Sequence, residues 1–401
     1  MLSKILYTTY DGILEPLGQS QVVCCIEKLA NFNKIFLISF EKESDWKNNE
    51  LRINMLRRMT IADITWLPLR YHKRPTALAT SLDMLVGVAA AAWIVLRHRI
   101  RIIHARSYVA SVIALALKRI SFLKLRYVFD MRGFWADERV DGGLWPAGGY
   151  LYRSAKWFER HFLLNADCVI ALTQAAMDEM RTFPYLQDRM PDFRIITTCA
   201  DLELFYPDKE SRPKDHPFTL GYVGSVGVWY LFDEVLRCFQ LMLEELPDAR
   251  LHILNRGGHE HIQERMKALA IDPSLVQIEA VDHAGVAQAM RRMDAGIFFI
   301  KPVYSKKASA PTKLGEFLGC GVPCLCNSGV GDIDSMIEKE RVGVLLKRFD
   351  MSAMRESVSS LLLMARQPGI RERCRTAAER YFSLEEGVSH YQRIYEDLAQ
   401  R

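Results

Sequence analysis

The sequence predicts an α/β protein of two doubly wound domains, each a parallel sheet with helices on both faces. First, 401 residues are too many for one ordinary hydrophobic core and suit two domains of roughly 200 residues. Second, short apolar runs alternate with longer helical segments, which is typical of parallel strands joined by crossover helices. Third, this alternation restarts after the polar, proline-containing residues 206–217, which we expect to be the interdomain linker.

The first predicted domain comprises residues 1–205. It begins with the strand-like run KILYTTY, followed by a polar loop that contains Gly12 and Gly18. Ser20 is a suitable N-cap for the next helix, which is expected to reach about Phe32. The remaining expected strands are KIFLISF, RIIHARS, LRYVFDMRG and CVIALT, and further helices are expected over 109–119 and 150–164.

The second predicted domain comprises residues 218–383. The run FTLGYVGSV is typical of a strand that ends in glycines, and YLFDEVLRCFQLMLEEL of the helix after it. Further strands are expected at ARLHILNRGG, SLVQIEAV, AGIFFIKP, VPCLCNS and VGVLL. The last helix, residues 384–401, presents Tyr391, Ile394 and Tyr395 at helical spacing, so we expect it to pack at the domain interface.

Cysteine usage and the N-terminal residues predict a cytoplasmic protein. Nine cysteines occur without a CxxC pair, most of them in apolar patterns, so we expect buried free thiols in a reducing compartment. Charged and turn-forming residues begin by Asp11 and no small-residue cleavage site follows, so no signal peptide is expected. Cys320, Cys324 and Cys326 have no histidine nearby, and we expect no metal site.

Basic residues concentrate in the first half of the chain. Residues 51–126 contain 14 Lys and Arg but only Asp63 and Asp83 as acids, in a chain of net charge +5. Such a region suits an anionic membrane surface, or is a solvated basic face. Nucleic acid is not expected, because no recognition motif accompanies the charge. The apolar run 82–96 is short for a membrane span, so we expect a buried core helix, with a membrane-surface helix as the alternative.

Two loops of the first domain are candidates for the functional site. Ligands of doubly wound sheets bind beyond the carboxyl ends of the strands, which places the expected site in the cleft between the domains. The loop DGILEPLGQSQ carries Gly12 and Gly18, which permit close approach of a ligand to the backbone. The loop FDMRGFWADERVDGGLW crowds Asp130 and Arg132 with further charges and tryptophans. This crowding favours acceptor recognition or catalysis over a salt-bridged surface loop.

Two loops of the second domain suit a nucleotide. GYVGSVGVWY places three glycines at a strand-to-helix turn, where backbone N–H groups can hold a phosphate. The glycine spacing is not that of a dinucleotide fingerprint, so NAD is not expected. In the segment IFFIKPVYSKKASAPTKLGEFLG, the loop after the strand carries Lys306, Lys307 and Lys313, with Ser309 as an expected N-cap and Pro311 in the first helical turn. Glu316, one turn into that helix, can accept hydrogen bonds from both hydroxyls of a ribose.

The segment KLGEFLGCGVPCLCNSGVGD resembles the donor-nucleotide segment of the retaining glycosyltransferases of family four, and ITTCADLELFYP resembles their interdomain signature. The resemblance extends over essentially the whole chain. It implies the GT-B fold, in which two Rossmann-like domains face each other across a cleft. It also implies Glu316 as the ribose-binding glutamate, Lys313 and the amides around Thr312 near phosphate, and transfer without a metal ion or cofactor.

The chain departs from this family at three places. Ala308 stands where the first of two glutamates is usual, and Ser225 and Val226 follow Gly224 where an arginine and a lysine are usual. The usual histidine at the end of a first-domain strand is replaced by the loop with Asp130 and Arg132. The departures leave open a UDP-, GDP- or CMP-linked donor, with Lys306 and Lys307 as substitute cations. If the enzyme inverts, the candidate bases are Asp11 and Asp130.

We therefore expect a glycosyltransferase that moves a sugar from a nucleotide-sugar donor to a glycan or lipid-linked acceptor in bacterial surface polysaccharide or glycoconjugate synthesis. The alternatives are a nucleotide-sugar 2-epimerase of the same fold and a catalytically inactive nucleotide-sugar-binding subunit. The expected location is the cytoplasm, at the inner face of the cell membrane. The predicted catalytic residues are Asp130, Arg132 and Lys313. The predicted donor-binding residues are Gly12, Gly18, Gly224, Ser225, Lys306, Lys307, Ser309, Thr312 and Glu316.

Overall fold

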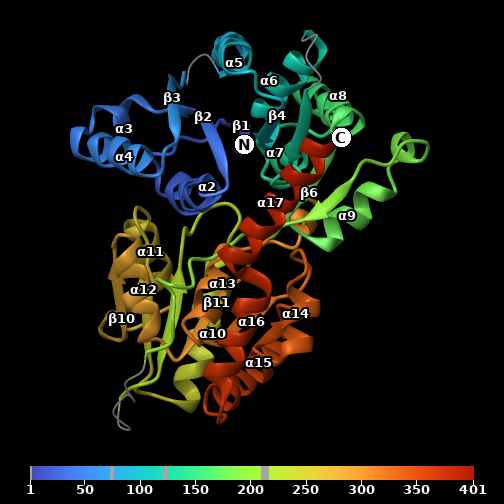
Figure 1. The fold of residues 1–401 in the computed structure, drawn as a ribbon. Coiled ribbons are helices and arrows are strands. Elements are labelled where there is room, and N and C mark those ends of the chain that lie inside the picture. The colour runs from blue at the N-terminus through green and yellow to red at the C-terminus, as the bar shows by residue number, and fades with distance from the viewer. Residues whose placement is uncertain (1, 73–75, 121–124, 209–215) are drawn as a thin grey trace. The chain divides into compact units, whose positions relative to one another are not determined.

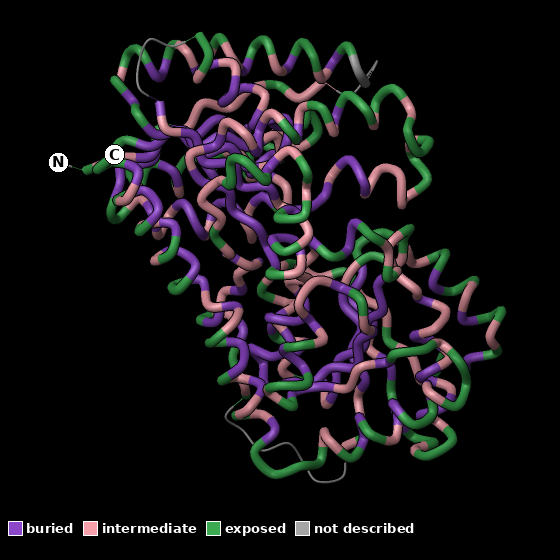
Figure 2. Tube along the Cα trace, turned by 90° about the vertical axis from the view of Figure 1, so that its right-hand side faces the viewer, coloured by how far each residue is buried: buried purple, intermediate pink, exposed green. Residues whose placement is uncertain are grey.

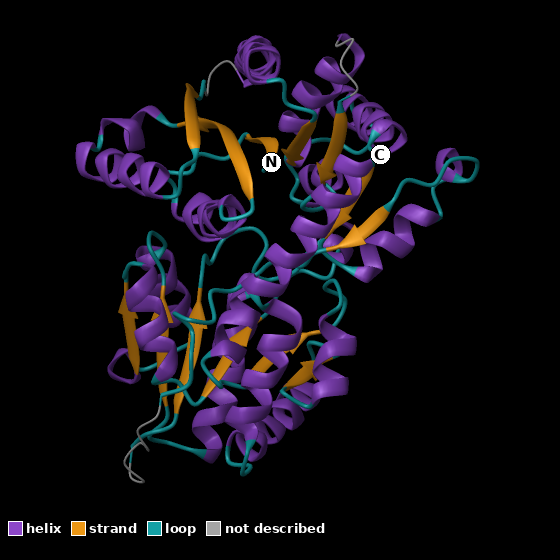
Figure 3. Ribbon diagram, viewed as in Figure 1, coloured by secondary structure: helices purple, strands orange, loops and turns teal. Residues whose placement is uncertain are grey.

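The computed structural model describes residues 2–72, 76–120, 125–208 and 216–401. The chain forms two compact units, one made of Met1–Thr197 with Leu384–Arg401 and the other of Thr198–Ser383. Each unit contains one parallel sheet flanked by helices (Figure 3). Buried residues lie mainly in the interior of each unit (Figure 2). Two doubly wound α/β domains, as the sequence predicts, are therefore confirmed.

The sheet of the first unit has seven strands in the order β3-β2-β1-β4-β5-β6-β7, all parallel (Figure 1). The order reverses between β1 and β4, where Tyr7 pairs with Leu37 on one side and His104 on the other. The carboxyl ends of these two strands are thus the switch point at which ligands of such sheets bind. The strands are β1 (Ser3–Thr9), β2 (Asn33–Glu41), β3 (Thr65–Arg70), β4 (Ile102–Arg106), β5 (Arg126–Asp130), β6 (Cys168–Ala171) and β7 (Phe193–Ile195).

The first helical run after β1 begins earlier than the sequence predicts. It starts at Pro16, whose fixed φ suits the first helical position, and Ser20 lies inside it and donates to Leu17 O. Ser20 is therefore not the N-cap. The helices of this unit are α1 (Pro16–Gly18), the π-helical η1 (Gln19–Val23), α2 (Cys24–Ala30), α3 (Glu43–Lys47), α4 (Asn49–Ile61), α5 (Thr76–His98), α6 (Ser107–Ile120), α7 (Trp135–Asp141), α8 (Tyr150–Asn165), α9 (Gln174–Arg181), the 3₁₀ turn η2 (Pro184–Leu186) and α17 (Leu384–Gln400).

Helix α5 is not the buried core helix that the sequence predicts. One face packs on α6, where Gly87 lies so close that a Cβ added to it would be 2.4 Å from Ile113 Cδ1. The opposite face leaves large apolar side chains exposed, and only 33% of the most apolar stretch is buried. Among the described residues α5 is the one helix long and apolar enough, over 78–98, to cross a membrane by length and composition. A uniformly apolar run cannot reveal from its composition which face lacks a partner.

The C-terminal helix α17 belongs to the first unit. It packs against α2, β1 and β4, with Tyr391, Ile394 and Tyr395 buried among them. At its N-terminal end, Lys28 pairs with Glu385 at 2.7 Å. The last helix thus completes the core of a unit whose strands lie more than 180 residues earlier in the chain.

The sheet of the second unit has six parallel strands in the order β10-β9-β8-β11-β12-β13. Its order reverses between β8 and β11. The strands are β8 (Thr219–Val223), β9 (Arg250–Leu254), β10 (Val276–Glu279), β11 (Ala295–Phe298), β12 (Cys324–Asn327) and β13 (Gly343–Leu346). The helices are α10 (Phe232–Glu245), α11 (His259–Ala268), η3 (Pro273–Leu275), α12 (His283–Arg291), η4 (Tyr304–Ala308), α13 (Thr312–Gly319), α14 (Ile333–Glu340), α15 (Met351–Ala365) and α16 (Ile370–Phe382).

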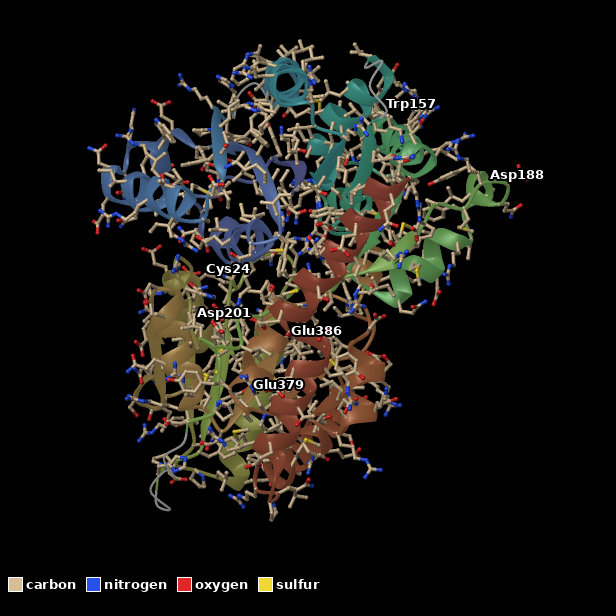
Figure 4. All side chains as sticks on the ribbon, viewed as in Figure 1. Cys24, Trp157, Asp188, Asp201, Glu379 and Glu386 are labelled. Atoms are coloured by element: carbon tan, nitrogen blue, oxygen red, sulfur yellow. The ribbon has the colours of Figure 1, made fainter. Side chains whose placement is uncertain are left out.

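The second unit begins at Thr198, upstream of the predicted boundary at 205. Residues 198–205 belong to it because they pack on α16. Arg375 donates to the carbonyls of Leu202 and Phe205 at 3.0 and 2.7 Å, and both residues are buried in the core of this unit. Asp201, labelled in Figure 4, closes the turn by accepting two backbone N–H groups. The expected linker, 206–217, falls within this unit, and its residues 209–215 lie outside the described residues.

Candidate functional site

The loop after β8 is shaped by a glycine and by pairing with the end of β11. Gly224 has φ +121°, a conformation that other residues rarely adopt. Downstream, Lys301 N donates to Trp229 O and Leu231 N donates to Phe299 O, both at 3.0 Å. This antiparallel pairing returns the loop to the carboxyl end of β11, the switch point of the sheet.

Lys313 brings a buried positive charge to this loop. It lies in the first turn of α13, and its side chain is buried with Nζ 3.9 Å from the ring centroid of Tyr230. Its Nζ has no hydrogen-bond partner within the described part of the chain. A Cβ on Gly224 would lie 2.6 Å from that nitrogen, so the glycine is what admits the ammonium. A buried ammonium without an acceptor is costly, and an anionic ligand would remove that cost.

The other two predicted lysines differ in setting. Lys306, in η4, is buried, and its Nζ lies 3.9 Å from the ring centroid of Trp229. Lys307 is exposed and lies 5.3 Å from the Tyr304 ring. The structure thus brings Lys306 and Lys313, but not Lys307, to the aromatic residues of the β8–α10 loop.

Glu316 is half-buried on α13, one turn after Lys313. Burial raises the pKa of Glu316 to about 7, and the neighbouring Lys313 ammonium opposes that rise. Helix α13 starts at Thr312 with Pro311 at its N-cap, so Ser309 is not the cap that the sequence predicts. Proline fits at this position because the first N–H groups of a helix have no partner within the helix, so the N–H group that proline lacks would not have been paired there.

A pocket of about 710 Å³ opens beside Gly224 in the second unit. Asn255, at the end of β9, ties its two walls together: Nδ2 donates to Gly224 O at 2.8 Å, and Oδ1 accepts from Gly257 and Gly258. The sequence points to Gly224 and Ser225 but not to Asn255. The run NRGG at a strand's carboxyl end is the signal that could have found it. The lining residues are Val223, Gly224, Ser225, Val226, Gly227, Leu254, Asn255, Arg256, Gly257, Gly258, His261, Val281 and Val286.

In the first unit, the predicted residues Asp11 and Arg132 lie at the switch point together with Arg106 and Gln21, which the sequence does not single out. Arg106, at the end of β4, pairs with Asp11 and donates to Gln21 Oε1 at 2.8 Å. Arg132, with φ +58°, donates to the same oxygen at 3.2 Å. A left-handed conformation at a non-glycine residue costs energy, and such positions often lie at functional sites.

Asp130 lies beneath this cluster, fully buried at the end of β5. Its carboxylate accepts from Tyr391 Oη at 3.1 Å and lies 3.4 Å from His104 Nε2. Burial opposes ionisation, but Arg132 and His104 outweigh it and hold the pKa of Asp130 below its usual value. In this conformation Asp130 is a buried counter-ion that orients Arg132, whereas Asp11 remains partly exposed.

The glycines of the first loop have an intramolecular role in the structure. A Cβ on Gly18 would lie 2.1 Å from Gly12 O, so the close approach is between two parts of the loop. The loop amides of Ile13 and Leu14 donate to the buried carboxylate of Glu41 at 3.0 and 3.2 Å. An internal carboxylate thus occupies the amides that a donor phosphate could have used.

The charges that follow Arg132 support the loop. Asp137 accepts from Tyr152 Oη and from Lys156 Nζ, both at 3.0 Å, which fixes α7 on α8. Arg139 lies over the Trp135 ring at 5.2 Å. These residues therefore behave as the salt-bridged surface loop that was the alternative interpretation of the sequence. Of the charged residues named in this loop, Asp130 and Arg132 are the ones that reach the switch point.

Comparison with known proteins supports this assignment of the fold. Residues 54–190, less than half of the chain, match the Glycosyl transferase 4-like domain. No curated protein matches the chain.

Solved structures match over nearly the full length. Sucrose-phosphate synthase from Thermosynechococcus elongatus has a TM-score of 0.72 at 14% identity and covers 99% of each chain. A glycosyltransferase from Rickettsia africae has a TM-score of 0.72 at 13% identity, over 100% of this chain and 99% of the other. Anabaena HepE, in complex with UDP and glucose, has a TM-score of 0.68 at 15% identity over 100% of both.

These matches confirm the GT-B fold of two Rossmann-like domains. The domain match over residues 54–190 supports an enzyme that transfers glycosyl groups, its donor unassigned.

Proposed function

We propose that this enzyme transfers a sugar from a nucleotide-sugar donor to a glycan or lipid-linked acceptor of bacterial surface polysaccharide or glycoconjugate synthesis. The observation that carries the proposal is the buried Lys313 ammonium, which has no hydrogen-bond acceptor in the described chain and lies against Gly224 at the rim of the 710 Å³ pocket. A buried cation beside a nucleotide-sized pocket is suited to bind the phosphate of a donor.

The donor would use the second unit as follows. Its nucleoside enters the pocket, its phosphate meets Lys313 and Lys306, and Glu316 accepts from the ribose hydroxyls. The lysines stabilise the negative charge that builds on the leaving phosphate, which lowers the barrier to transfer without a metal ion. In retaining transfer the acceptor hydroxyl attacks from the face that the phosphate leaves. Anabaena HepE structures contain UDP and UDP-glucose, which favours UDP among the candidate nucleotides.

The acceptor side would be the cluster of Asp11, Arg106 and Arg132 in the first unit. Arg106 and Arg132 provide donors for acceptor hydroxyls or a phosphate, and Asp11 is the partly exposed carboxylate of the cluster. If the reaction proceeds with inversion, Asp11 is a better placed base than the buried Asp130.

Binding and turnover can be tested in sequence. Titration calorimetry with UDP, GDP and CMP should give binding to one nucleotide, and the matching nucleotide sugars should then be consumed only when an acceptor extract is present. Consumption without acceptor would indicate the epimerase, and binding without consumption the inactive subunit. Absence of binding to all three nucleotides would refute the proposal.

We also propose that the first unit docks on the anionic inner surface of the cell membrane. The exposed apolar residues of α5 recur at helical spacing on one stripe, opposite the face that carries Gly87. Exposed Arg97, Arg99 and Arg101 follow immediately. An apolar stripe with basic flanks is the pattern of helices that lie in a membrane interface. The stripe consists of Leu78, Leu82, Leu85, Val86, Trp93 and Leu96.

Vesicle co-sedimentation tests the docking. The protein should bind phosphatidylglycerol vesicles at low salt and dissociate from them at high salt, and it should not bind vesicles of pure phosphatidylcholine. Leu85→Asp should weaken binding, whereas Leu363→Asp, in the second unit and equally exposed at 69%, should not. Equal effects of the two variants, or equal binding to both lipids, would refute the docking.

A further inference from the structure

We infer that Trp229 and Tyr230 are positioning residues that hold Lys306 and Lys313 for the donor phosphate. This inference rests on the proposed binding of a nucleotide sugar. The β8–α10 loop, residues 224–231, contains no lysine, arginine or histidine of its own. The nearest buried cations come instead from η4 and α13, and each lies over one aromatic ring of that loop.

The geometry of the two pairs is alike. Lys306 Nζ lies 3.9 Å from the Trp229 ring centroid, and Lys313 Nζ lies 3.9 Å from that of Tyr230. Both rings are set by the backbone, because the bonds from Lys301 to Trp229 and from Leu231 to Phe299 fix the segment along the end of β11. The adjacent positions 229 and 230 therefore hold two cations that are seven residues apart in the chain.

An aromatic ring suits this purpose better than a carboxylate. The face of the ring attracts an ammonium electrostatically but accepts no conventional hydrogen bond, so the N–H donors of the lysine remain available. A carboxylate partner would neutralise the charge and compete with the incoming phosphate. The N–H donors of Lys313 are available in this sense, since its buried Nζ has no acceptor among the residues that the structure describes. The rings thus position the charge without cancelling it.

The experiment compares a nucleotide with its nucleoside. On the nucleotide that binds most tightly among UDP, GDP and CMP, Tyr230→Leu should lower affinity by about 5- to 30-fold, the range that a desolvated cation–π contact supports. Affinity for the corresponding nucleoside, which has no phosphate, should not change. Tyr230→Phe keeps the ring and should restore nucleotide affinity. Tyr206→Leu removes a ring under Arg291 at the same 3.9 Å distance and should leave nucleotide affinity unchanged.

A double-mutant cycle separates positioning of the lysine from support of the loop. In a Lys313→Met background, Tyr230→Leu should have no further effect on nucleotide affinity. If Tyr230→Leu does not fold, Trp229→Leu with Lys306→Met gives the equivalent cycle. Additive losses, or equal losses of nucleotide and nucleoside affinity, would overturn the inference while nucleotide binding by the unmodified protein preserves the proposed function. Absence of any nucleotide binding by the unmodified protein would overturn both.

Discussion

Replacing Glu316 by glutamine should stabilise the ligand-free protein above pH 7 and at the same time weaken its binding of a nucleotide. Burial raises the pKa of this carboxyl from 4.5 to about 7, against the attraction of the Lys313 ammonium. The folded state therefore retains a proton that the unfolded chain has already lost between these pH values. Because the folded state binds more protons, the free energy of unfolding is highest below pH 4.5, as far as Glu316 is concerned, and it decreases as the pH rises through 7.

The raised pKa sets the size of the effect. A rise from 4.5 to about 7 corresponds to about 3 kcal/mol lost on ionisation. Glutamine has the same shape and no charge, so it should remove this loss at pH 8 and change little at pH 4. Nucleotide affinity should fall by about 30- to 1,000-fold, because two charge-assisted hydrogen bonds to the ribose become weaker or are lost.

Urea unfolding of the second unit, followed at pH 4 and pH 8, measures the first effect, and calorimetric titration measures the second. The unfolding midpoint of the glutamine variant should exceed that of the unmodified protein only at pH 8. If the variant shows the same pH dependence as the unmodified protein, Glu316 is not the titrating group. If its nucleotide affinity is unchanged, Glu316 does not contact the ribose.

Two further predictions concern the phosphate side of the same site. In steady-state kinetics, Lys313→Met should lower kcat as much as kcat/KM, as expected for a contact that strengthens in the transition state, and Lys306→Met should act in the same direction. Lys307 is exposed, so Lys307→Met should change KM at most. Identical behaviour of all three variants would contradict this prediction. Gly224→Ala should abolish nucleotide binding, because the backbone has φ +121° and the new Cβ would lie 2.6 Å from Lys313 Nζ. Gly369→Ala is the matched control, since its φ is also positive at +77°, nothing lies within 4 Å of its Cβ and it does not line the pocket, and equal calorimetric titrations of the two alanine variants would refute the explanation.

The sequence by itself determined the architecture, since alternation of strands and helices is a local signal. Most of the strands are short apolar runs, the crossovers contain longer helical segments, and strand ends carry glycines such as Gly224. The same signals located the segment with Lys313 and Glu316, because a lysine-rich loop before a helix is visible without any tertiary contact. The strand expected at LRYVFDMRG is likewise present as β5, although it ends at Asp130, three residues before the end of the expected run.

Only the tertiary structure decided which faces and charges remain available. The run 82–96 has the composition of a core helix, and its exposure depends on which neighbours reach it. Asp130 looks reactive in sequence but is covered by Tyr391, 261 residues away, which makes it a buried counter-ion. The tertiary structure places Gly224 and Tyr230 beside Lys313, and it shows that the Lys313 ammonium has no hydrogen-bond acceptor among the residues described. Burial and pairing are sums over residues that are distant in the chain, whereas the periodicity that specifies the fold is contained within each segment.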